Sequence, residues 1–484
     1  MKKYIAIILG IGFLHRLLLL GARQLWTDEL MQARIVKFSS LSEMLKGLRE
    51  GMDLAAPLDF LVQKGTAFIL GESAWALRFH AVIFGTLSIW IFYRIACFLF
   101  GRRVAAYSAT LFTFFPLAYH YSQEARPYAL LLFLSLVSYD LLLRQVFQAN
   151  RTWRGWLWLG GVLTLLLYTS CLGFLIIVTQ GVSLVLAVAW KMGPAGPPPV
   201  GEGETPVPER SAVRWSQVAA YGAAALAAAL LFYPWMRFVW VRPLVAPSSE
   251  IADPKLILRL IKELGDNSYP VAGLLLIGMA TGIRAMFRHG RSRLLQWLLI
   301  WFLLPIPVLL LTEIWAGYFF AIRHILNATP PILLIAGYGL SYVGERLTIL
   351  PHLPYQLSSP ALGFAGLLLL ASVWIGQSHA RSEPADWYGT AAFLSNTLRQ
   401  GDVVTMPQVY ALLEYYNPGL ESFRVADLDP GPGMLASGDV RRRIVACYDK
   451  MWPDPCTGFR AAALKDPAWR ERQFPGFILF LRVK

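Results

Sequence analysis

Two adjacent carboxylates, Asp28 and Glu29, lie in the stretch LWTDELMQA, a few residues after the first apolar block of the chain. An ionised carboxylate just after an apolar block can remove a proton from a reacting group or bind a metal ion. Trp26, just before the pair, belongs to a residue type that is enriched where a membrane meets water. A second interpretation stays open, in which the pair is the solvated end of a loop.

A second polar group interrupts the apolar sequence at HYSQEARPYAL, residues 120–130. Gln123, Glu124 and Arg126 stand there between two long apolar blocks, in a turn too short to carry its charges far from a bilayer surface. Ionisable residues at membrane depth cost free energy, so they mark candidate functional sites. The alternative is a local ion pair between Glu124 and Arg126, which contributes little where it is exposed.

A third polar group occurs in AGYFFAIRHILNATPP, residues 316–331. Arg323, His324 and Asn327 lie about one turn inside an otherwise apolar helix, and the four-residue spacing of Arg323 and Asn327 puts them on one face. The planar fork of an arginine suits a phosphate group. The alternative is an arginine that extends to the interface, which the positive-inside rule disfavours on the outer side.

The elements that must position these groups are membrane helices. The chain has 484 residues, of which 56% are apolar and 15% are charged, whereas soluble domains average about 45–50% apolar residues. The apolar residues come in blocks close to the ~20 residues that a helix needs to cross a bilayer. The sequence therefore predicts an α-helical, multi-pass membrane protein.

The net charge of +14 reports topology rather than a nucleic-acid partner. Basic residues gather in short hydrophilic gaps between apolar blocks, which is the pattern of cytoplasmic loops. These gaps carry Arg102 and Arg103, then Arg144, Arg151 and Arg154, then Arg284, Arg288, Arg291 and Arg293. We therefore predict membrane lipids, and no nucleic acid, as the surroundings of this charge.

With a cytoplasmic amino terminus, the blocks give about eleven transmembrane helices and an extracytoplasmic carboxyl terminus. The predicted bounds are an end near 21 for the first helix, then 73–100, 104–121, a fourth ending before the 144–154 gap, a pair on either side of 170–171, 215–232, an eighth returning to the 284–293 gap, a ninth ending near 313, 320–343 and 361–377. All three polar groups then lie on the outer side, which suggests one site near the outer leaflet.

Two domains are predicted. A transmembrane catalytic domain covers 1–378, with an outer loop at 22–72, a proline- and glycine-rich cytoplasmic linker at 191–214 and a second outer loop at 235–270. A small extracytoplasmic α/β domain covers 379–484, with a helix before a turn at 399–401, a strand at DVVTM, a second helix and a last strand in FPGFILFLRVK. Its cysteines, Cys447 and Cys456, fit an oxidising compartment and a short disulfide loop; the alternative is two buried free thiols.

The chain resembles the integral-membrane glycosyltransferases of the GT-C fold, in the branch of protein mannosyltransferase-like and aminoarabinose transferase-like enzymes. The resemblance covers most of the chain. It rests on the acid pair after the first helix and on ALRFHAVIFGTLSIWIFYRIACFLFG, YSQEARPYAL, IRHILNATPPILLIAGYGL and ADWYGTAAFL followed by GDVV. It implies a hexosyl- or pentosyltransferase in the plasma (inner) membrane. Such an enzyme moves a sugar from a polyprenyl phosphate to an acceptor lipid, glycan or protein outside the membrane, with inversion at the sugar carbon.

The resemblance also implies roles for the acids. Asp28 is the candidate base that removes the acceptor proton, with Glu29 beside it in the catalytic pair. Glu29 and Glu124 shape the site or hold a divalent cation. No nucleotide cofactor is expected, in agreement with a sequence that contains no glycine-rich phosphate loop.

The basic residues are implied as contacts of the donor. Arg126 and Arg323 are the candidates for binding the lipid phosphate, which must be stabilised as it leaves. Tyr128 and His324 are further candidate substrate contacts.

One departure from the family pattern concerns the outer loop. Relatives carry HPPL or KPPL where this chain has AAPL in DLAAPLDFL. Ala55 and Ala56 cannot bind phosphate or metal, and the sequence does not choose among Asp53, Asp59 and Lys64 as a replacement. Metal dependence is therefore left open.

Three other functions compete with transfer of a single sugar. An oligosaccharide ligase uses the same class of donor and cannot be separated by sequence. A transporter or flippase for lipid-linked sugars also needs outer charges, but its expected inverted repeats are not visible. A third alternative is a non-catalytic subunit of an assembly. Its function would depend on the terminal domain, whereas catalysis would depend on Asp28.

Overall fold

The computed structural model of the chain has two compact units. The larger consists of Met1–Leu20 and Phe38–Gln377, and the smaller of Gly21–Lys37 and Ser378–Lys484. The structure describes residues 2–53, 55–148, 152–190, 213–240, 258, 261–262, 264–265, 268–316, 322–346, 386–398, 403–405, 413, 415–417, 420, 424–426, 443–448, 460, 463–465, 469–475 and 477–482. Most of the predicted linker at 191–214, most of the loop at 235–270, the helix at 361–377 and the boundary at 378 lie outside these residues.

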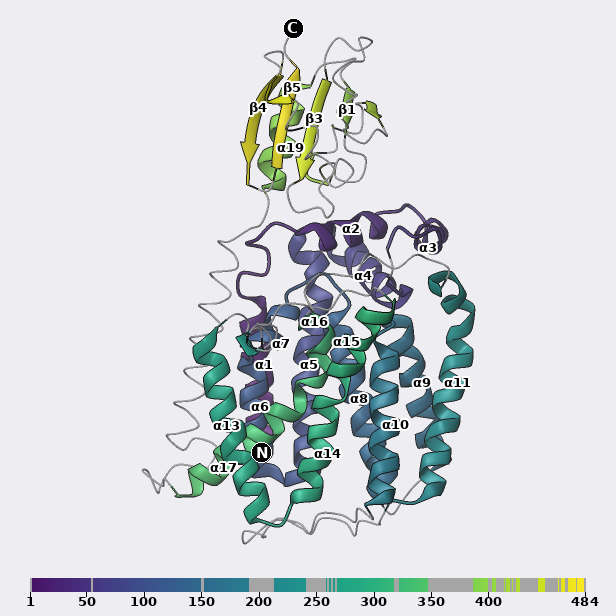
Figure 1. The fold of residues 1–484 in the computed structure, drawn as a ribbon, viewed down its shortest axis with the longest axis vertical. Coiled ribbons are helices and arrows are strands. Elements are labelled where there is room, and N and C mark those ends of the chain that lie inside the picture. Colours follow the sequence, from purple (N-terminus) through teal and green to yellow (C-terminus); the bar gives the residue numbers. More distant parts are fainter. Residues whose placement is uncertain are drawn as a thin grey trace. The chain divides into compact units, whose positions relative to one another are not determined.

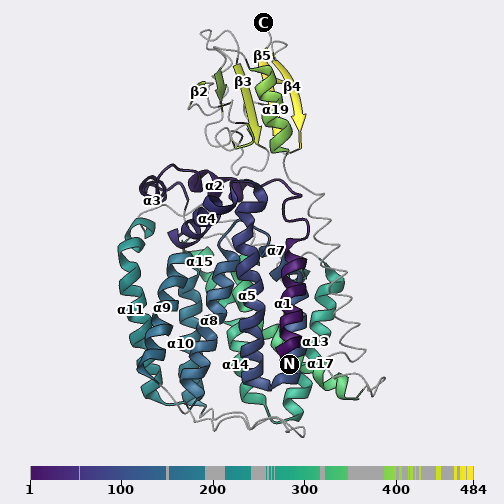
Figure 2. The ribbon, with the colours of Figure 1, turned by 180° about the vertical axis from the view of Figure 1, so that it is seen from behind.

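The larger unit is a bundle of helices (Figures 1 and 2). Up to residue 147 its helices are α1 (Lys2–Leu17), α3 (Leu41–Glu50), α4 (Pro57–Leu70), α5 (Ala74–Phe100), α6 (Arg102–Phe114), α7 (Pro116–Tyr121) and α8 (Tyr128–Phe147). Then follow α9 (Trp153–Thr169), α10 (Gly173–Ala189), α11 (Trp215–Trp240), α13 (Tyr269–Arg288), α14 (Ser292–Leu303), α15 (Pro305–Ala316), α16 (Ile322–Ile325), the 3₁₀ turn η2 (Leu326–Ala328) and α17 (Pro330–Arg346).

Five of the described helical segments are long and apolar enough to cross a membrane. They are Ala74–Phe100, Tyr128–Phe147, Trp215–Phe238, Tyr269–Arg288 and Ser292–Thr312. The shorter segments Gly173–Ala189 and Pro330–Gly344 are also apolar. The chain is therefore a mostly helical integral membrane protein, as the sequence predicted, while the number of about eleven spans stays a prediction.

The centre of the larger unit is α5, the longest span. The Ser73 hydroxyl accepts a hydrogen bond from the Ala76 amide at 3.3 Å and so caps the start of the helix. The helix ends where Gly101 takes a positive φ of 88°, a conformation that glycine adopts without strain. With 27 residues α5 is ~40 Å long, and it packs against α1, α4, α6 and α8.

A close helix pair, α13 and α17, packs through glycines. Gly278 and Gly282 are four apart on α13. A Cβ atom on Gly282 would meet the main chain of Ile335, and one on Gly339 would meet both α13 glycines. Small residues at this spacing let membrane helices approach closely, since lipid supplies no hydrophobic force to drive them together.

Two predicted helices are broken by proline. The sequence predicted one helix over 104–121, but α6 ends at Phe114 and Pro116 begins α7. The predicted helix over 320–343 is likewise divided into α16, η2 and α17, which begins at Pro330. Proline has no N–H group and clashes with the preceding turn, so it is favoured in the first turn of a helix over the interior.

The predicted outer loop at 22–72 is largely helical. Within the larger unit, Ser40 caps the start of α3, because its hydroxyl accepts a hydrogen bond from the Glu43 amide at 3.1 Å. Hydrogen bonds from the Ser39 hydroxyl and the Ser40 amide lower the pKa of Glu43. α4 follows and packs against α5. The segment 21–37 instead belongs to the smaller unit.

The smaller unit combines α2 (Thr27–Val36) with a sheet and α19 (Trp387–Thr397). The strands are β1 (Val403–Thr405), β2 (Arg424–Ala426), β3 (Arg443–Tyr448), β4 (Trp469–Phe474) and β5 (Phe477–Arg482), in the order β2-β1-β3-β5-β4. β1 is parallel to β2 and β3, whereas β5 is antiparallel to β3 and β4. Trp387 packs edge-on against Phe477 at 4.8 Å and so fixes α19 to the sheet.

The prediction for this domain was partly right. The helix before the turn, the strand in DVVTM and the last strand are present, but the sequence analysis missed β2, β3 and β4. FPGFILFLRVK is not one strand, because Phe474 and Phe477 pair across a two-residue connection between β4 and β5. The second predicted helix lies mostly outside the described residues. So does Cys456, and the side chain of Cys447 is not described, which leaves the disulfide a prediction.

Candidate active site

The turn between α7 and α8, residues 122–127, is anchored to the end of α1. Gln123 donates its side-chain amide to the carbonyls of Arg16 at 2.9 Å and Leu18 at 2.6 Å. Arg78 of α5 donates to the carbonyl of Leu20 at 2.9 Å. The last carbonyls of a helix have no partner within it, so Gln123 supplies a partner to the end of α1. Arg78 binds the turn that follows α1.

A buried cation strengthens this anchor. Arg16 is fully buried and donates to the Ser122 hydroxyl at 3.2 Å and to the carbonyls of Gly12 and Thr113 at 3.2 and 3.3 Å. Buried guanidinium groups are costly unless their N–H groups find acceptors, and Nε and Nη1 of Arg16 find them here. The turn that carries Glu124 and Arg126 is therefore held rigidly against two helices.

The charged residues of this turn are paired with other elements. Arg126 lies 3.0 Å from Asp53, which precedes α4, and both side chains are about nine-tenths buried. Glu124 lies 3.0 Å from the His120 ring, one helical turn earlier on α7. The acid and the base of the turn each have a partner other than the one that the sequence suggested. Tyr128 is buried at the start of α8, edge-on to Tyr121.

The three residues that could replace the missing side chains of the AAPL motif, Asp53, Asp59 and Lys64, make different contacts in the structure. Asp53 reaches the turn through Arg126. Asp59 is fully buried and lies 3.3 Å from the buried His80 of α5. Lys64 donates to the carbonyl of Phe38 at 2.6 Å. The contact with Arg126 thus places Asp53 against the turn, and the choice of a replacement for the family motif stays open.

The third polar group is divided between α16 and η2, and a shared face of Arg323 and Asn327 stays a prediction. His324 and Asn327 line a small cavity with Tyr139 and Trp301, and Arg323 is not among its lining residues. The expectation that Arg323 and Asn327 share a face needed a continuous α-helix. The chain instead enters the 3₁₀ turn η2 at Leu326, where residues three apart eclipse each other.

The acid pair divides into two roles on α2. Glu29 is fully buried, and its carboxylate accepts a hydrogen bond from the Trp26 amide at 3.3 Å, which ties the first turn of α2 to its cap. Asp28, in the same first turn, is partly exposed. Glu29 therefore has a structural task in α2, and a catalytic role for Asp28 stays a prediction.

The segment before α2 is bound to the carboxyl-terminal residues of the smaller unit. Gln24 accepts from the Tyr388 amide at 3.1 Å and donates to Asp386 at 3.4 Å. The Leu25 amide donates to the Tyr416 hydroxyl at 2.8 Å. Lys37, just after α2, lies 4.3 Å above the ring of Tyr415. Both ends of the acid-bearing helix are thereby fixed to the terminal domain.

Tyr416→Phe is expected to loosen α2 without unfolding the terminal domain. Removal of the hydroxyl leaves the buried Leu25 amide without this partner, at a cost of about 1–3 kcal/mol. Hydrogen–deuterium exchange of residues 21–37 should become faster. Tyr415→Phe, which keeps the ring beneath Lys37, serves as the control, and equal exchange in both variants would contradict this role of Tyr416.

Metal ligation has no assembled site among the described residues. No group of three or more His, Cys, Asp or Glu side chains lies close enough there to hold an ion. Glu29, Glu124 and Asp53 all have other partners. A divalent cation stays an open expectation, and none of the chemistry below passes through one.

Sequence reasoning missed two residues that contact this turn, His120 and Arg16, and left a third, Asp53, unresolved. His120 was inside the quoted motif but not singled out, although its four-residue spacing from Glu124 was a usable signal. Asp53 was one of three possibilities, because its pairing with Arg126 joins residues far apart in the chain. Nothing in the sequence alone indicated that Arg16 anchors the turn.

Three comparisons place this architecture among known proteins. The fold matches the crystal structure of ArnT from Cupriavidus metallidurans in the apo state with a TM-score of 0.65 and 14% identity, over 100% of this chain and 98% of that chain. The same protein bound to undecaprenyl phosphate matches with a TM-score of 0.64, 13% identity and the same coverage. The chain has their fold.

A more distant match is the oligosaccharyltransferase AglB from Archaeoglobus fulgidus, in complex with an inhibitory peptide and a dolichol-phosphate. It gives a TM-score of 0.52 and 12% identity, over 92% of this chain and 69% of that chain. The sequence model of the dolichyl-phosphate-mannose-protein mannosyltransferase family matches residues 55–192. No curated protein matches the sequence. The resemblance to GT-C glycosyltransferases is thus confirmed for the fold.

The three polar groups are distributed over both units. The turn with Glu124, Arg126 and Tyr128 and the segment with Arg323 and His324 belong to the larger unit, whereas Asp28 and Glu29 belong to the smaller. Their meeting at one site stays a prediction.

Proposed function

We propose that the protein is a membrane glycosyltransferase that moves a sugar from a polyprenyl phosphate to an acceptor on the outer face of the membrane, with inversion. The observation that carries the proposal is the likeness of the whole chain to ArnT, which has been captured with undecaprenyl phosphate. The family match over 55–192 supports it independently, since it covers the turn with Glu124 and Arg126.

In this proposal Asp28 is the general base. It accepts the proton of the acceptor hydroxyl while the hydroxyl oxygen forms a bond to the sugar C1 atom. The bond between C1 and the phosphate oxygen breaks on the opposite side, which inverts C1, and the polyprenyl phosphate leaves with the electron pair. Asp28 suits this task because it is partly exposed while Glu29 holds the helix start.

Arg126 is proposed to stabilise the negative charge that develops on the leaving phosphate, with Arg323 as a second cation. Preorganised donors act best when they need not move during the reaction. The partner of Arg126, Asp53, and the buried anchor beneath the turn supply that fixity. Glu124, Tyr128 and His324 are proposed as further contacts of the substrates.

The proposal is tested by mass spectrometry of a host strain. The gene is deleted and restored, and the lipids, envelope glycans and secreted proteins of the two strains are compared. A species that is heavier by one sugar in the restored strain supports the proposal and identifies the acceptor. A mass increment of several sugars indicates an oligosaccharide ligase. The likeness to the oligosaccharyltransferase AglB favours this second candidate function. No mass change, with altered transport of the lipid-linked sugar, would overturn both.

Arg126→Gln is expected to lower transfer by roughly 10²-fold, the usual effect of removing one donor that stabilises developing negative charge. The measurement is the initial rate of transfer by membranes that contain equal amounts of folded protein. Arg49→Gln, which removes an exposed cation from α3, should leave the rate unchanged. If folded Arg126→Gln retains the full rate, Arg126 does not stabilise the leaving phosphate.

A further inference from the structure

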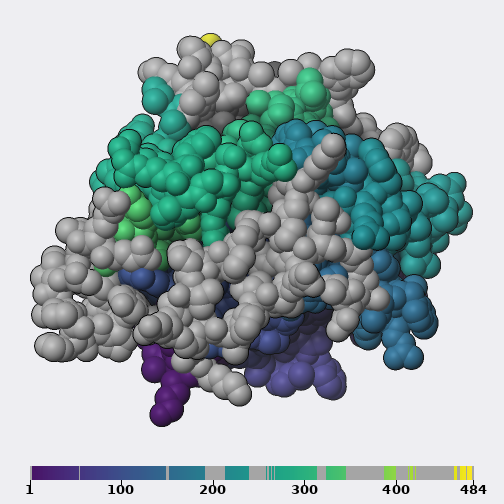
Figure 3. Space-filling model, turned by 90° about the horizontal axis from the view of Figure 1, so that it is seen from below, coloured from purple at the N-terminus to yellow at the C-terminus, as the bar shows by residue number. Residues whose placement is uncertain are grey.

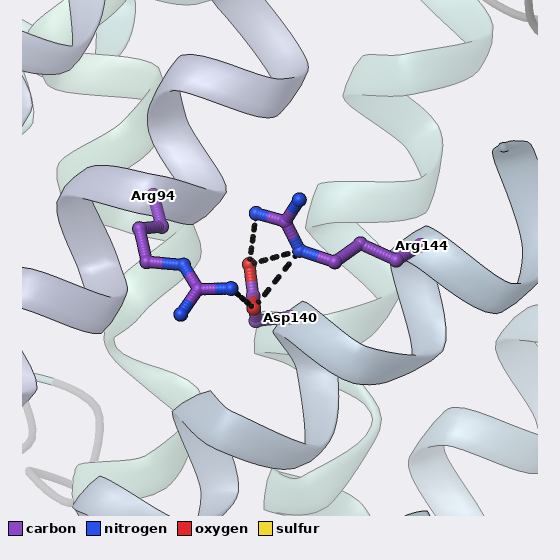
Figure 4. A network of polar contacts seen from close by, with 3 residues as sticks. All are labelled: Arg94, Asp140 and Arg144. Carbon is purple, nitrogen blue, oxygen red and sulfur yellow. Dashed lines mark hydrogen bonds and ion pairs between the residues drawn. The ribbon is translucent and has the colours of Figure 1, made fainter. Parts of the chain in front are cut away.

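A second charged cluster connects α5 and α8 outside the candidate site. Figure 4 shows Arg94 of α5 and Arg144 of α8 converging on Asp140. Arg144 donates from Nε to both carboxylate oxygens at 3.1 Å and from Nη2 to Oδ1 at 2.9 Å. Arg94 Nη2 lies 2.7 Å from Oδ2, which it shares with Arg144. Asp140 is buried, whereas the two arginine side chains are 35% and 30% exposed.

The cluster contains more positive charge than is needed to satisfy the carboxylate of Asp140 between α5 and α8. Arg144 alone satisfies Asp140 with a forked set of hydrogen bonds. Arg94 therefore adds a cation that no second carboxylate balances in the part of the chain that the structure describes. A charge within an apolar span is costly and is retained where it has a function. The partly exposed heads of both arginines leave room for an anion from outside the protein.

The cluster lies at the basic end of the larger unit. Arg94 is six residues before the end of α5 and Asp140 is seven before the end of α8, which is ~10 Å along each helix. Long arginine side chains reach from this depth to the headgroup layer. The exposed Trp90 lies beneath Arg94 at 5.2 Å, and tryptophan is typical of that layer.

The same end carries other cations. Tyr4 of α1 donates to Ala106 of α6, so the start of α1 lies beside the turn that joins α5 to α6 (Figures 1 and 2). Seen from below, the first residues stand at the edge of this face (Figure 3). Lys2, Lys3, Arg102 and Arg103 are all in these segments. Such basic ends attract anionic lipids.

We propose that Arg94 and Arg144, oriented by Asp140, bind the phosphate of an anionic phospholipid headgroup. Two guanidinium groups on neighbouring helices present converging N–H donors, the arrangement that phosphate oxygens accept. The net positive charge of the cluster matches a headgroup with one negative charge. Asp140 holds the guanidinium groups of Arg94 and Arg144 in place when one lipid molecule leaves and another binds.

The site is independent of the proposed sugar transfer. Asp140 is twelve residues along α8 from Tyr128, or ~18 Å, so the donor phosphate at the turn would not occupy it. The lipid would act as a bridge between α5 and α8, which Arg144 already joins by lying 5.8 Å from the ring of Phe98.

The test uses the purified full-length chain in detergent, with lipid retention measured by native mass spectrometry. Phosphatidylglycerol, phosphatidylcholine and inorganic phosphate are added in separate samples. The wild type should retain phosphatidylglycerol in preference to phosphatidylcholine, and Arg94→Gln should lower that retention about tenfold. Arg144 still satisfies Asp140 in this variant, so the fold should persist.

Arg102→Gln is the matched control, because it removes an exposed cation from the same end of the unit. Equal retention of phosphatidylglycerol by Arg94→Gln and Arg102→Gln would overturn the proposal. The lipid would then be held by the general positive charge of this end of the unit. Displacement of the lipid by inorganic phosphate would overturn the lipid as the natural ligand. If Arg94→Gln fails to fold, Arg94→Lys, which keeps the charge and loses the fork, should fold and retain less lipid than the wild type.

Discussion

Asp28→Asn is expected to lower sugar transfer by roughly 10²–10⁴-fold, the range that general bases contribute. The amide has nearly the shape of the carboxylate but cannot accept the acceptor proton. As a first-turn acid, Asp28 contributes about 0.3–1 kcal/mol to α2 through the helix dipole, so the fold should survive its neutralisation. The measurement is the amount of the sugar-bearing species in a deletion strain that carries the variant.

Two matched variants separate catalysis from structure. Glu50→Gln removes an exposed carboxylate that lies 3.7 Å from Lys46 on the surface of α3, and it should transfer at the wild-type rate. Glu29→Gln disturbs the cap of α2, so it should destabilise the smaller unit rather than stop chemistry selectively. If folded Asp28→Asn restores every sugar-bearing species that the wild type restores, Asp28 is not the base. A transporter or an assembly subunit is then the favoured function.

The spans were the predictable part of the fold, since each depends on local sequence. The helix expected over 73–100 is α5, Ala74–Phe100, because a serine cap and a glycine stop stand beside an apolar block. The breaks at Pro116 and Pro330 were equally local and were missed because apolar character was given more weight than proline. The three-helix path of the outer loop depends on tertiary contacts, such as those of α4 with α5, which periodicity does not encode.

The candidate site was predictable in residue type but not in pairing. Glu124 and Arg126 were selected because charges in a short membrane turn are unusual. That they belong to His120 and Asp53 follows from how α4 and α7 fold back, which a local pattern cannot show. The division of labour between Asp28 and Glu29 likewise depends on burial, because the two residues have the same chemistry and adjacent positions.

His80→Phe is expected to destabilise the larger unit by about 1–3 kcal/mol, the cost of taking a polar partner away from a buried group. His80 Nδ1 lies 2.9 Å from the carbonyl of Leu77, which can only accept, so this nitrogen donates and Nε2 faces Asp59 at 3.3 Å. Removal of the ring leaves the fully buried carboxylate of Asp59 without this partner, between α4 and α5. The temperature at which half of the detergent-purified protein is lost from size-exclusion chromatography should fall.

A double-variant cycle tests whether the loss comes from this pair. Asp59→Leu combined with His80→Phe removes both polar groups and leaves an apolar contact of similar size, which is often neutral for stability. The double variant should therefore be more stable than His80→Phe alone. If the effects of the two single changes simply add, the residues are not coupled, and the attachment of α4 to α5 rests on apolar packing around Phe60 instead.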